Sequence, residues 1–497
     1  MNDARSETAL ASLRSAYAGR LWTEPAETAA FLTDWRGKCT GPALAVAQPA
    51  DTAEVAQLLA WCHVHRVPVV PQGGNTGLSG GSVPEADMAE GSLPLLLSLT
   101  RLNRVRQMDP LNNTVVVEAG ATLLQVQEAA REAGRLFPLS LAAEGSCTIG
   151  GNLATNAGGV QVLRYGNARE LCLGLEVVTP EGEVWNGLRT LRKDNTGYDL
   201  RDLYIGSEGT LGVITAAVLK LFPLPAAQMV ALVGVPTPEA ALQLLVLAQQ
   251  RVGASLTAFE LLSDTCMQLV VHHVPGTRRP LAEASPWYVL LEVSVTGSEA
   301  DAQVHAAQTM EALLEAAIEQ GVVTDAALST TLAQFEALWA LRENISEAQG
   351  AEGPTIKHDI ALPISRIPEF IARTDAAVAS TFPQVRQITF GHLGDGNLHY
   401  NASPAIPVTP GPLGAAVKAA FLALEGPLNQ LVHDAVHDFG GSISAEHGLG
   451  VLRRDESARY KAPLELRLMH RIKAALDPEG LMNPAKLLPQ PAAGHRR

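Results

Sequence analysis

The chain has 497 residues, of which 47% are hydrophobic and 18% charged, a composition that indicates a folded protein and excludes a disordered one. A chain of this length is expected to form two or three domains. Its 37 Lys and Arg against 51 Asp and Glu give a net charge of −14, which disfavours general nucleic-acid binding, because phosphate requires a basic surface.

The cysteines and the N-terminus bear on the cellular compartment. Five cysteines are scattered along the chain without a CxxC pair, which favours a reducing compartment over a disulfide framework or a cysteine metal site. The opening MNDARSETALASLR contains no apolar signal-peptide core, and no apolar run reaches the length of a bilayer span. We therefore expect a cytoplasmic protein without a membrane span.

Taken in order, the chain is expected to form four parts. Residues 1–39 are predicted to be a helical N-terminal extension. Residues 40–225 alternate apolar strands with Gly-rich turns, the pattern of an α+β nucleotide-type domain. Residues 226–465 alternate strands with helices, which predicts an antiparallel sheet with helices on one face. Residues 466–488 are predicted to return to the first domain. The clearest strand candidates are 67–71, 94–99, 114–120, 173–180 and 212–222, and the clearest helices are 52–66, 238–252 and 299–320.

Three loops rich in Gly, Ser, Thr and Asn lie beside strand candidates of the first domain, at 68–84, 145–167 and 206–215. Glycines allow close backbone approach, so that successive amides can form an anion-binding concavity, for which a pyrophosphate is the natural occupant. One such loop alone could be a plain surface turn, but three together favour a single extended cofactor. The sequence lacks a complete GxGxxG and a GxxxxGK[ST], which disfavours a Rossmann NAD site and a P-loop.

Four motifs in this region carry a family resemblance. PQGGNTGLSGGSVP, IGGNLATNAGG, LRKDNTGYDL and GSEGTLGVIT together resemble the two-part FAD-binding domain of the vanillyl-alcohol-oxidase type flavoproteins, over about residues 40–225. Some members of that family attach FAD through a His in the first loop, where this chain has Asn75, so we expect noncovalent FAD. The FAD-binding residues implied by the resemblance are Gln72, Gly73, Gly74, Asn75, Thr76, Gly77, Ser82, Glu144, Thr148, Gly151, Asn152, Thr155, Asn156, Glu208, Ile214 and Asn483. Of these, the first-loop residues would hold the diphosphate, the residues between Thr148 and Asn156 would approach the flavin and ribityl chain, and Glu208 and Ile214 would lie near the adenine half.

A second pattern, ITFGHLGDGNLHYN at 388–401, indicates a hairpin. Asp395-Gly396 between apolar runs is a strong signal for a two-residue turn. Such a turn would place His392 directly opposite His399 on one face, with their Cβ atoms about 4.5–5.5 Å apart, a separation suited to sharing a metal ion. Asn401, two residues further on, shares this face.

A third metal ligand is available in SISAEHGLG at 442–450, where Glu446 ends a strand candidate. Two His and one carboxylate leave coordination positions open on a divalent ion, and this ligand set suits zinc, with manganese, iron or cobalt as alternatives. The competing interpretation is that these are separate histidines without a metal.

The same motifs carry a second resemblance. FGHLGDGNLHYN and AEHGLG resemble the C-terminal domain of FAD-linked D-2-hydroxyacid dehydrogenases, a group that includes D-lactate, glycolate and D-2-hydroxyglutarate dehydrogenases. WALRENISEA (339–348) and TIKHDIALP (355–363) are most similar to the last of these. The resemblance implies His392, His399 and Glu446 as metal ligands, and Arg342, Ser346, Lys357, Asn401 and His447 as substrate-binding residues.

These residue types suit FAD-dependent oxidation of a D-2-hydroxy acid to the 2-oxo acid. A metal would lower the pKa of the substrate hydroxyl, His447 would act as general base, and the hydride would pass to FAD. Arg342 and Lys357 can pair with carboxylates, which favours a dicarboxylate such as D-2-hydroxyglutarate. The alternatives are a D-lactate or glycolate dehydrogenase, a metal-dependent hydrolase, and a non-catalytic flavin subunit. The electron acceptor could be an electron-transfer flavoprotein, a quinone or a cytochrome, and the oligomeric state is open, a homodimer included.

Overall fold

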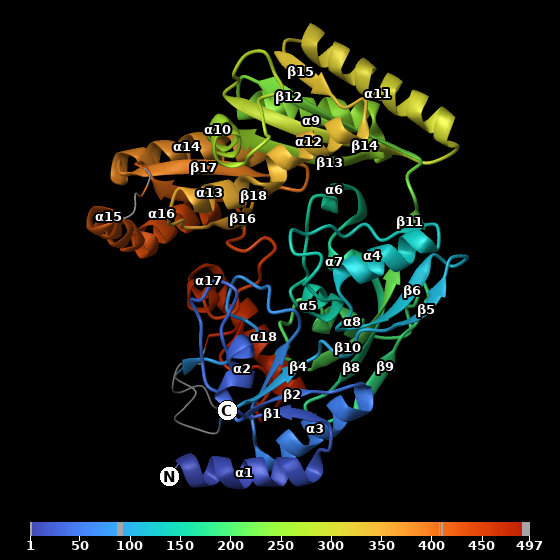
Figure 1. Cartoon of the computed structure of the whole chain (residues 1–497), viewed down its shortest axis with the longest axis vertical. Coiled ribbons are helices and arrows are strands. Elements are labelled where there is room, and N and C mark those ends of the chain that lie inside the picture. The colour runs from blue at the N-terminus through green and yellow to red at the C-terminus, as the bar shows by residue number, and fades with distance from the viewer. Residues whose placement is uncertain (1, 87–92, 407, 409–410, 490–497) are drawn as a thin grey trace. The chain divides into compact units, whose positions relative to one another are not determined.

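The chain folds into two compact units (Figure 1). The computed structural model describes residues 2–86, 93–406, 408 and 411–489. Unit 1 comprises residues 1–158, 166–223 and 446–497, and unit 2 comprises 159–165 and 224–445. The C-terminal segment that belongs to unit 1 thus begins at residue 446, twenty residues before the expected 466, and a short piece of the second glycine-rich loop belongs to unit 2.

Unit 1 contains a four-stranded sheet in the order β1-β2-β4-β3. Strands β2 and β3 run parallel to β4, whereas β1 is antiparallel to β2. Helix α3 connects β2 to β3; the Asp51 side chain caps its start, and the helix ends where Arg66 adopts a φ of 56°. The buried face of α3 packs into a core with these strands. The bounds are β1 Arg20–Trp22, β2 Ala45–Gln48, α3 Thr52–His65, β3 Val69–Gln72 and β4 Leu95–Ser98.

A second, five-stranded antiparallel sheet of unit 1 has the order β5-β6-β10-β8-β9. Helix α5 packs against β6 and β10 and therefore holds the second glycine-rich loop over this sheet. The strands are β5 Val105–Asp109, β6 Thr114–Glu118, β8 Cys172–Val178, β9 Val184–Gly187 and β10 Val213–Lys220, with the short pair β7 Arg135–Leu136 and β11 Phe222–Pro223. The other helices are α1 Asn2–Ala16, α2 Pro25–Leu32, α4 Leu123–Glu132, α5 Ile149–Ala154, α7 Ala168–Leu171, α8 Leu200–Tyr204, α17 Arg454–Tyr460 and α18 Pro463–Leu476.

Unit 2 is built on a seven-stranded antiparallel sheet in the order β15-β12-β14-β13-β17-β18-β16. The strands are β12 Ala227–Val235, β13 Leu256–Ser263, β14 Trp287–Val295, β15 Asp325–Leu328, β16 Asp359–Ala361, β17 Val385–His392 and β18 Asn397–Pro404. The helices are α6 Val162–Tyr165, α9 Pro238–Arg251, α10 Asp264–His273, α11 Glu299–Glu319, α12 Leu332–Glu343, α13 Ile345–Ala351, α14 Ile367–Thr381, α15 Pro412–Leu422 and α16 Glu425–Asp438.

Helices cover both faces of this sheet, so the expectation of helices on one face was wrong. Val230 and Leu232 of β12 share a core with α10, α12 and α13, whereas Ala231 and Val233, which point to the opposite face, are equally buried. Helices α9 and α11 pack on β12 and β14, and the buried residues of α11 lie outside that core. The α+β class with an antiparallel second sheet is confirmed. Within the part of the chain described, no helix has both the length and the apolarity needed to cross a bilayer.

Candidate active site

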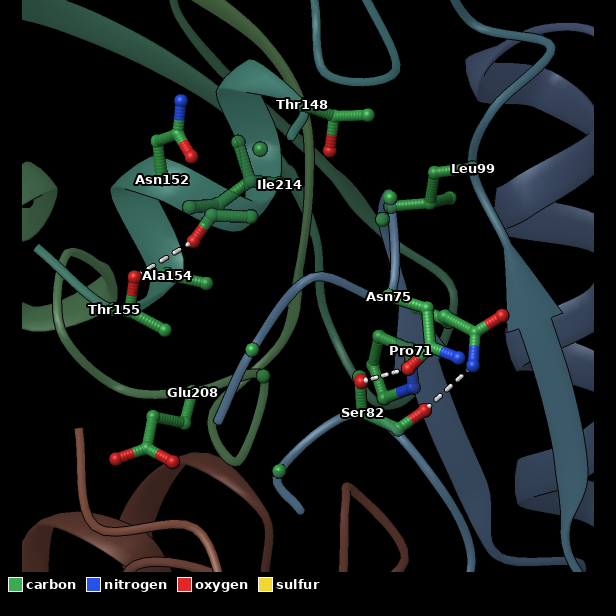
Figure 2. Close-up of a pocket in the computed structure, with 18 of the residues that line it drawn as sticks. Pro71, Asn75, Ser82, Leu99, Thr148, Asn152, Ala154, Thr155, Glu208 and Ile214 are labelled. Carbon is green, nitrogen blue, oxygen red and sulfur yellow. Dashed lines mark hydrogen bonds between the residues drawn. The ribbon is translucent and has the colours of Figure 1, made fainter. Parts of the chain in front are cut away.

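The three glycine-rich loops of unit 1 converge on one pocket. Its lining draws on all three loops, which suits an extended cofactor, and the space among the lining residues is about 930 Å³ with open solvent included. It lies between strand ends of the two sheets, with Pro71 and Leu99 on one side and Ile214 on the other (Figure 2). Of the residues expected to bind FAD, those that line it are Gln72, Gly73, Gly74, Asn75, Thr76, Gly77, Ser82, Thr148, Gly151, Asn152, Thr155, Glu208 and Ile214.

Close packing between the first two loops explains two of the glycines. A Cβ on Gly73 would lie 2.3 Å from the Thr148 Oγ1, and one on Gly74 would lie 1.9 Å from the Ser146 carbonyl oxygen. The clash at Gly74 is with backbone, so glycine is required there, whereas a Cβ at Gly73 would force the Thr148 hydroxyl to move. Within the described residues the Thr148 hydroxyl is buried and has no hydrogen-bond partner, although it lines the pocket. A polar ligand that accepts from or donates to this hydroxyl fits the site, as the diphosphate or ribityl part of FAD would.

Three residues expected to bind FAD do not line the pocket. The Glu144 Oε1 accepts hydrogen bonds from the Ser140 hydroxyl at 2.8 Å and the Gln127 amide at 3.0 Å, so this side chain fastens its own loop. The Asn156 Oδ1 accepts from the Arg169 backbone N–H at 3.0 Å. The Asn483 Nδ2 donates to the carbonyl oxygens of Gly81 and Glu208 at 2.9 and 2.7 Å. Asn483 therefore connects the C-terminal segment to the first and third loops.

Glu208 holds the segment that carries His447. Its two carboxylate oxygens each accept a backbone N–H at 2.8 Å, one from Leu449 and one from Gly450. Burial raises the pKa of Glu208, whereas the two backbone donors and Lys486 oppose this rise. Figure 2 shows the carboxylate turned toward the backbone of this segment, away from the helix that carries Asn152. As a result, His447 lines the pocket. The sequence predicted His447 as a substrate contact and general base, but not as part of the flavin pocket.

The histidine hairpin of unit 2 is wider than expected. Strands β17 and β18 pair Phe390 with His399 and Ile388 with Asn401, so the register differs by two residues from the direct pairing of His392 with His399. Four residues, 393–396, form the turn because the backbone N–H groups of both Asp395 and Gly396 donate to the His392 carbonyl oxygen. The two histidines still share one face, diagonally, and their ring centroids are 5.6 Å apart.

Each histidine has a carboxylate on the neighbouring strand. Glu260 of β13 is paired with His392, and its Oε1 lies 2.7 Å from the His392 Nδ1. Asp359 of β16 is paired with His399, and its Oδ1 lies 3.8 Å from the His399 Nδ1. Burial raises the pKa of Glu260, but His392 and Arg342 outweigh burial and lower it to about 2, so this side chain is a carboxylate. A histidine whose Nδ1 faces a carboxylate directs Nε2 outward, an arrangement typical of metal-binding histidines.

Glu446 is the third candidate ligand, beside the two histidines. Ala445, the last residue of unit 2, donates its backbone N–H to the Asp359 carbonyl oxygen at 3.2 Å, so the chain reaches Glu446 directly from the edge of this sheet. Ligand atoms of His392, His399 and Glu446 lie within 4.8 Å of one another. Two imidazoles and a carboxylate at this spacing fit a divalent cation such as zinc.

The residues expected to bind substrate have different environments. Arg342 is buried on α12, donates from Nε to the Glu260 Oε2 at 2.7 Å, and stacks on Phe390 with 4.8 Å between guanidinium carbon and ring centroid. Lys357 is half-buried just before β16. Ser346 is exposed on α13. Asn401 is buried and already bonded on both sides of its amide, to the His358 backbone N–H and to Gln349. Glu260, Asp359 and Gln349 were not expected from the sequence.

The fold, the pocket and two matching family models together define an FAD-linked oxidase. Among solved structures, p-cresol methylhydroxylase superposes with a TM-score of 0.73 at 15% identity, covering 97% of both chains. The family model "FAD binding domain" matches residues 43–187 of this sequence, and the family model "FAD linked oxidases, C-terminal domain" matches residues 224–487.

Curated relatives cover nearly the whole chain. The mitochondrial D-2-hydroxyglutarate dehydrogenase of Bos taurus is 40% identical over 484 residues, which is 97% of this chain and 84% of the relative. That of Xanthomonas citri pv. viticola is 41% identical over 468 residues, 94% of each. A putative D-lactate dehydrogenase of Schizosaccharomyces pombe is 36% identical over 473 residues, 93% of this chain and 85% of the relative. The chain belongs to the D-2-hydroxyglutarate dehydrogenase family of FAD-linked oxidases and is a flavin-dependent oxidoreductase.

Proposed function

We propose that this enzyme oxidises D-2-hydroxyglutarate to the 2-oxo acid, with noncovalent FAD in the pocket of unit 1. We further propose that His392, His399 and Glu446 bind a divalent cation, for which zinc is the preferred candidate. Two consecutive residues carry the proposal. His447 lines the flavin pocket, and Glu446 completes the ligand group with the two histidines. One peptide bond therefore links the residue expected to accept a proton to a residue expected to bind the metal.

When bound, the cation would lower the pKa of the substrate hydroxyl and FAD would accept the hydride from the carbon that bears it. His447 accepts the hydroxyl proton in this scheme, as general base. Arg342 pairs with a substrate carboxylate; its Nε is held by Glu260, and a guanidinium has five N–H donors, so further donors serve the substrate. Lys357 is the second cation, which supports a dicarboxylate over lactate.

Noncovalent attachment is supported by the side chains around the pocket. Asn75, at the position where some relatives have a His, donates to the Thr33 carbonyl oxygen and accepts from Ser82. Among the described residues that line the pocket, His447 is the only His, Cys or Tyr. We therefore expect acid precipitation to release all of the flavin into the supernatant.

The test is anaerobic bleaching of the bound flavin by a panel of D- and L-2-hydroxy acids, before and after chelation. D-2-Hydroxyglutarate should bleach the flavin fastest, and chelation should slow bleaching while leaving the flavin spectrum intact. Adding zinc or cobalt back should restore the rate of bleaching. Equal kcat/KM for D-lactate and D-2-hydroxyglutarate would instead favour the alternative of a lactate dehydrogenase, as the name of the yeast relative suggests. Full activity in protein shown to be metal-free would exclude the metal. Turnover with an electron-transfer flavoprotein, a quinone or a cytochrome would then identify the acceptor.

A further inference from the structure

Glu260 is a buried carboxylate with two different partners. It lies on β13, its side chain is fully buried, and each oxygen makes its own contact. One oxygen meets the Nδ1 of His392 at 2.7 Å and the other meets the Nε of Arg342 at 2.7 Å. The first partner is an expected metal ligand and the second an expected substrate contact, yet Glu260 itself is in neither group.

Each contact removes a rotational freedom that the site would otherwise retain. The Nδ1 contact selects the imidazole tautomer that has its lone pair on Nε2 and fixes the plane of the ring. The Nε contact orients the guanidinium, which Phe390 supports from one side by stacking at 4.8 Å. Because one carboxylate makes both contacts, the direction of the His392 ring and the direction of the Arg342 fork are set by a single group.

A second carboxylate on the same face provides a direct comparison. Glu292 of β14 is also buried and also bonded by α12, through the Trp339 Nε1 at 3.0 Å, one helical turn before Arg342. Its other oxygen accepts from the Thr257 hydroxyl at 2.7 Å. Glu292 therefore also joins α12 to the sheet, but among the described residues its hydrogen-bond partners are Trp339, Thr257, Gln228 and Ser294, with no histidine or arginine.

We propose that Glu260 is a positioning residue that directs both His392 toward the metal and Arg342 toward a substrate carboxylate. This inference rests on the proposed metal site and deepens it. If it holds, loss of the carboxylate weakens metal binding in the absence of substrate and separately weakens substrate binding when metal is saturating. A merely structural carboxylate would do neither in a protein that remains folded.

The experiment compares Glu260→Gln with Glu292→Gln in the flavin-loaded protein. Metal affinity is measured by competition with a chromophoric chelator, with zinc and no substrate, and the ligand geometry is followed in the electronic spectrum of the cobalt form. We expect Glu260→Gln to weaken zinc binding about 10- to 100-fold and to raise the KM for D-2-hydroxyglutarate at saturating zinc more than it lowers kcat. Glu292→Gln should lower the melting temperature but keep zinc affinity within about threefold, well short of the change expected of a ligand-supporting carboxylate.

If the glutamine variant does not fold, Glu260→Asp takes its place, because it retains a buried negative charge beside Arg342. Its carboxylate is one methylene shorter and cannot keep both 2.7 Å contacts, so zinc affinity or KM must still change. Zinc affinity and KM equal to those of the unaltered protein in either folded variant overturns the inference, as does an equal loss in Glu292→Gln. Absence of zinc binding in the unaltered protein would instead refute the proposed metal site, so the two failures are distinguishable.

Discussion

Replacing Gly74 by alanine tests how the first glycine-rich loop is held against the second. The new Cβ would lie 1.9 Å from the Ser146 carbonyl oxygen and 2.9 Å from its carbonyl carbon. Ordinary van der Waals contact begins at 3.4 Å, so the two loops must separate by about 1.5 Å. Both clashing atoms belong to the backbone, and no side-chain rotation can relieve the overlap.

The separation has a direct effect on FAD binding. Overpacking of this kind costs about 1–3 kcal/mol, and the displaced backbone belongs to a loop that lines the pocket. Because about 1.4 kcal/mol corresponds to a tenfold change in Kd, we expect FAD affinity to fall roughly 10- to 100-fold.

The assay is titration of FAD into the deflavinated protein, followed by flavin fluorescence, together with the flavin absorbance of the purified variant. Gly145→Ala is the matched control, since it lies in the facing loop, does not line the pocket, and its Cβ would meet nothing within 4 Å. Unchanged FAD affinity in Gly74→Ala, or an equal loss in Gly145→Ala, would refute the packing argument.

Three further changes test the proton acceptor, the dicarboxylate preference and the acid stability of unit 1. His447→Ala should lower kcat about 10²- to 10⁴-fold with flavin and metal content unchanged, and an unaltered pH–rate profile would argue against a base at this position. Lys357→Met should raise the KM for D-2-hydroxyglutarate more than that for D-lactate, and parallel changes would place Lys357 outside substrate recognition. Burial raises the pKa of Glu118, but Arg104 and Arg106 outweigh it, so the pKa is lowered overall. The Glu118 carboxylate therefore stabilises the fold above its unfolded pKa of about 4.5. This stabilisation is lost as the pH falls through the lower pKa that Glu118 has in the folded protein. Glu118→Gln should accordingly reduce the urea midpoint at neutral pH more than in acid, and equal losses at both would contradict the sign.

The flavin pocket was predictable because its chemistry is local in sequence. Glycines that permit a close approach, such as Gly73 and Gly74, and hydroxyl and amide side chains such as Thr148 and Asn152 lie within short loops beside apolar strands, so composition alone marks them. Glu144 shows where this reasoning fails. A carboxylate in a glycine-rich loop serves equally well to fasten the loop itself, and the Ser140 and Gln127 donors decide between these uses only in three dimensions.

Glu260 was out of reach for a different reason. It lies 132 residues before His392, on a strand that reads simply as apolar, and the two meet because β13 is the neighbour of β17 in the sheet. That neighbour relation is not sequential, since β14 lies on the other side of β13. Without the strand order, a single acidic residue in LTAFELLS gives no sign of a partner. The second helical layer of unit 2 was missed for another reason. A strand buried on both faces differs from a strand buried on one only in the polarity of alternate residues, and in β12 those residues are apolar on both faces.

The hairpin shows which errors of register matter. The Asp395-Gly396 signal predicted a two-residue turn, whereas the turn has four residues and pairs His399 with Phe390. Side chains alternate between faces with a period of two, so a slip of two residues exchanges a directly opposed pair for a diagonal one on the same face. The ring centroids, 5.6 Å apart, remain close enough for the two histidines to bind the same metal ion. A slip of one residue would have put the histidines on opposite faces and removed any shared site. The metal proposal thus depends on the parity of the register and not on the turn type from which it was first inferred.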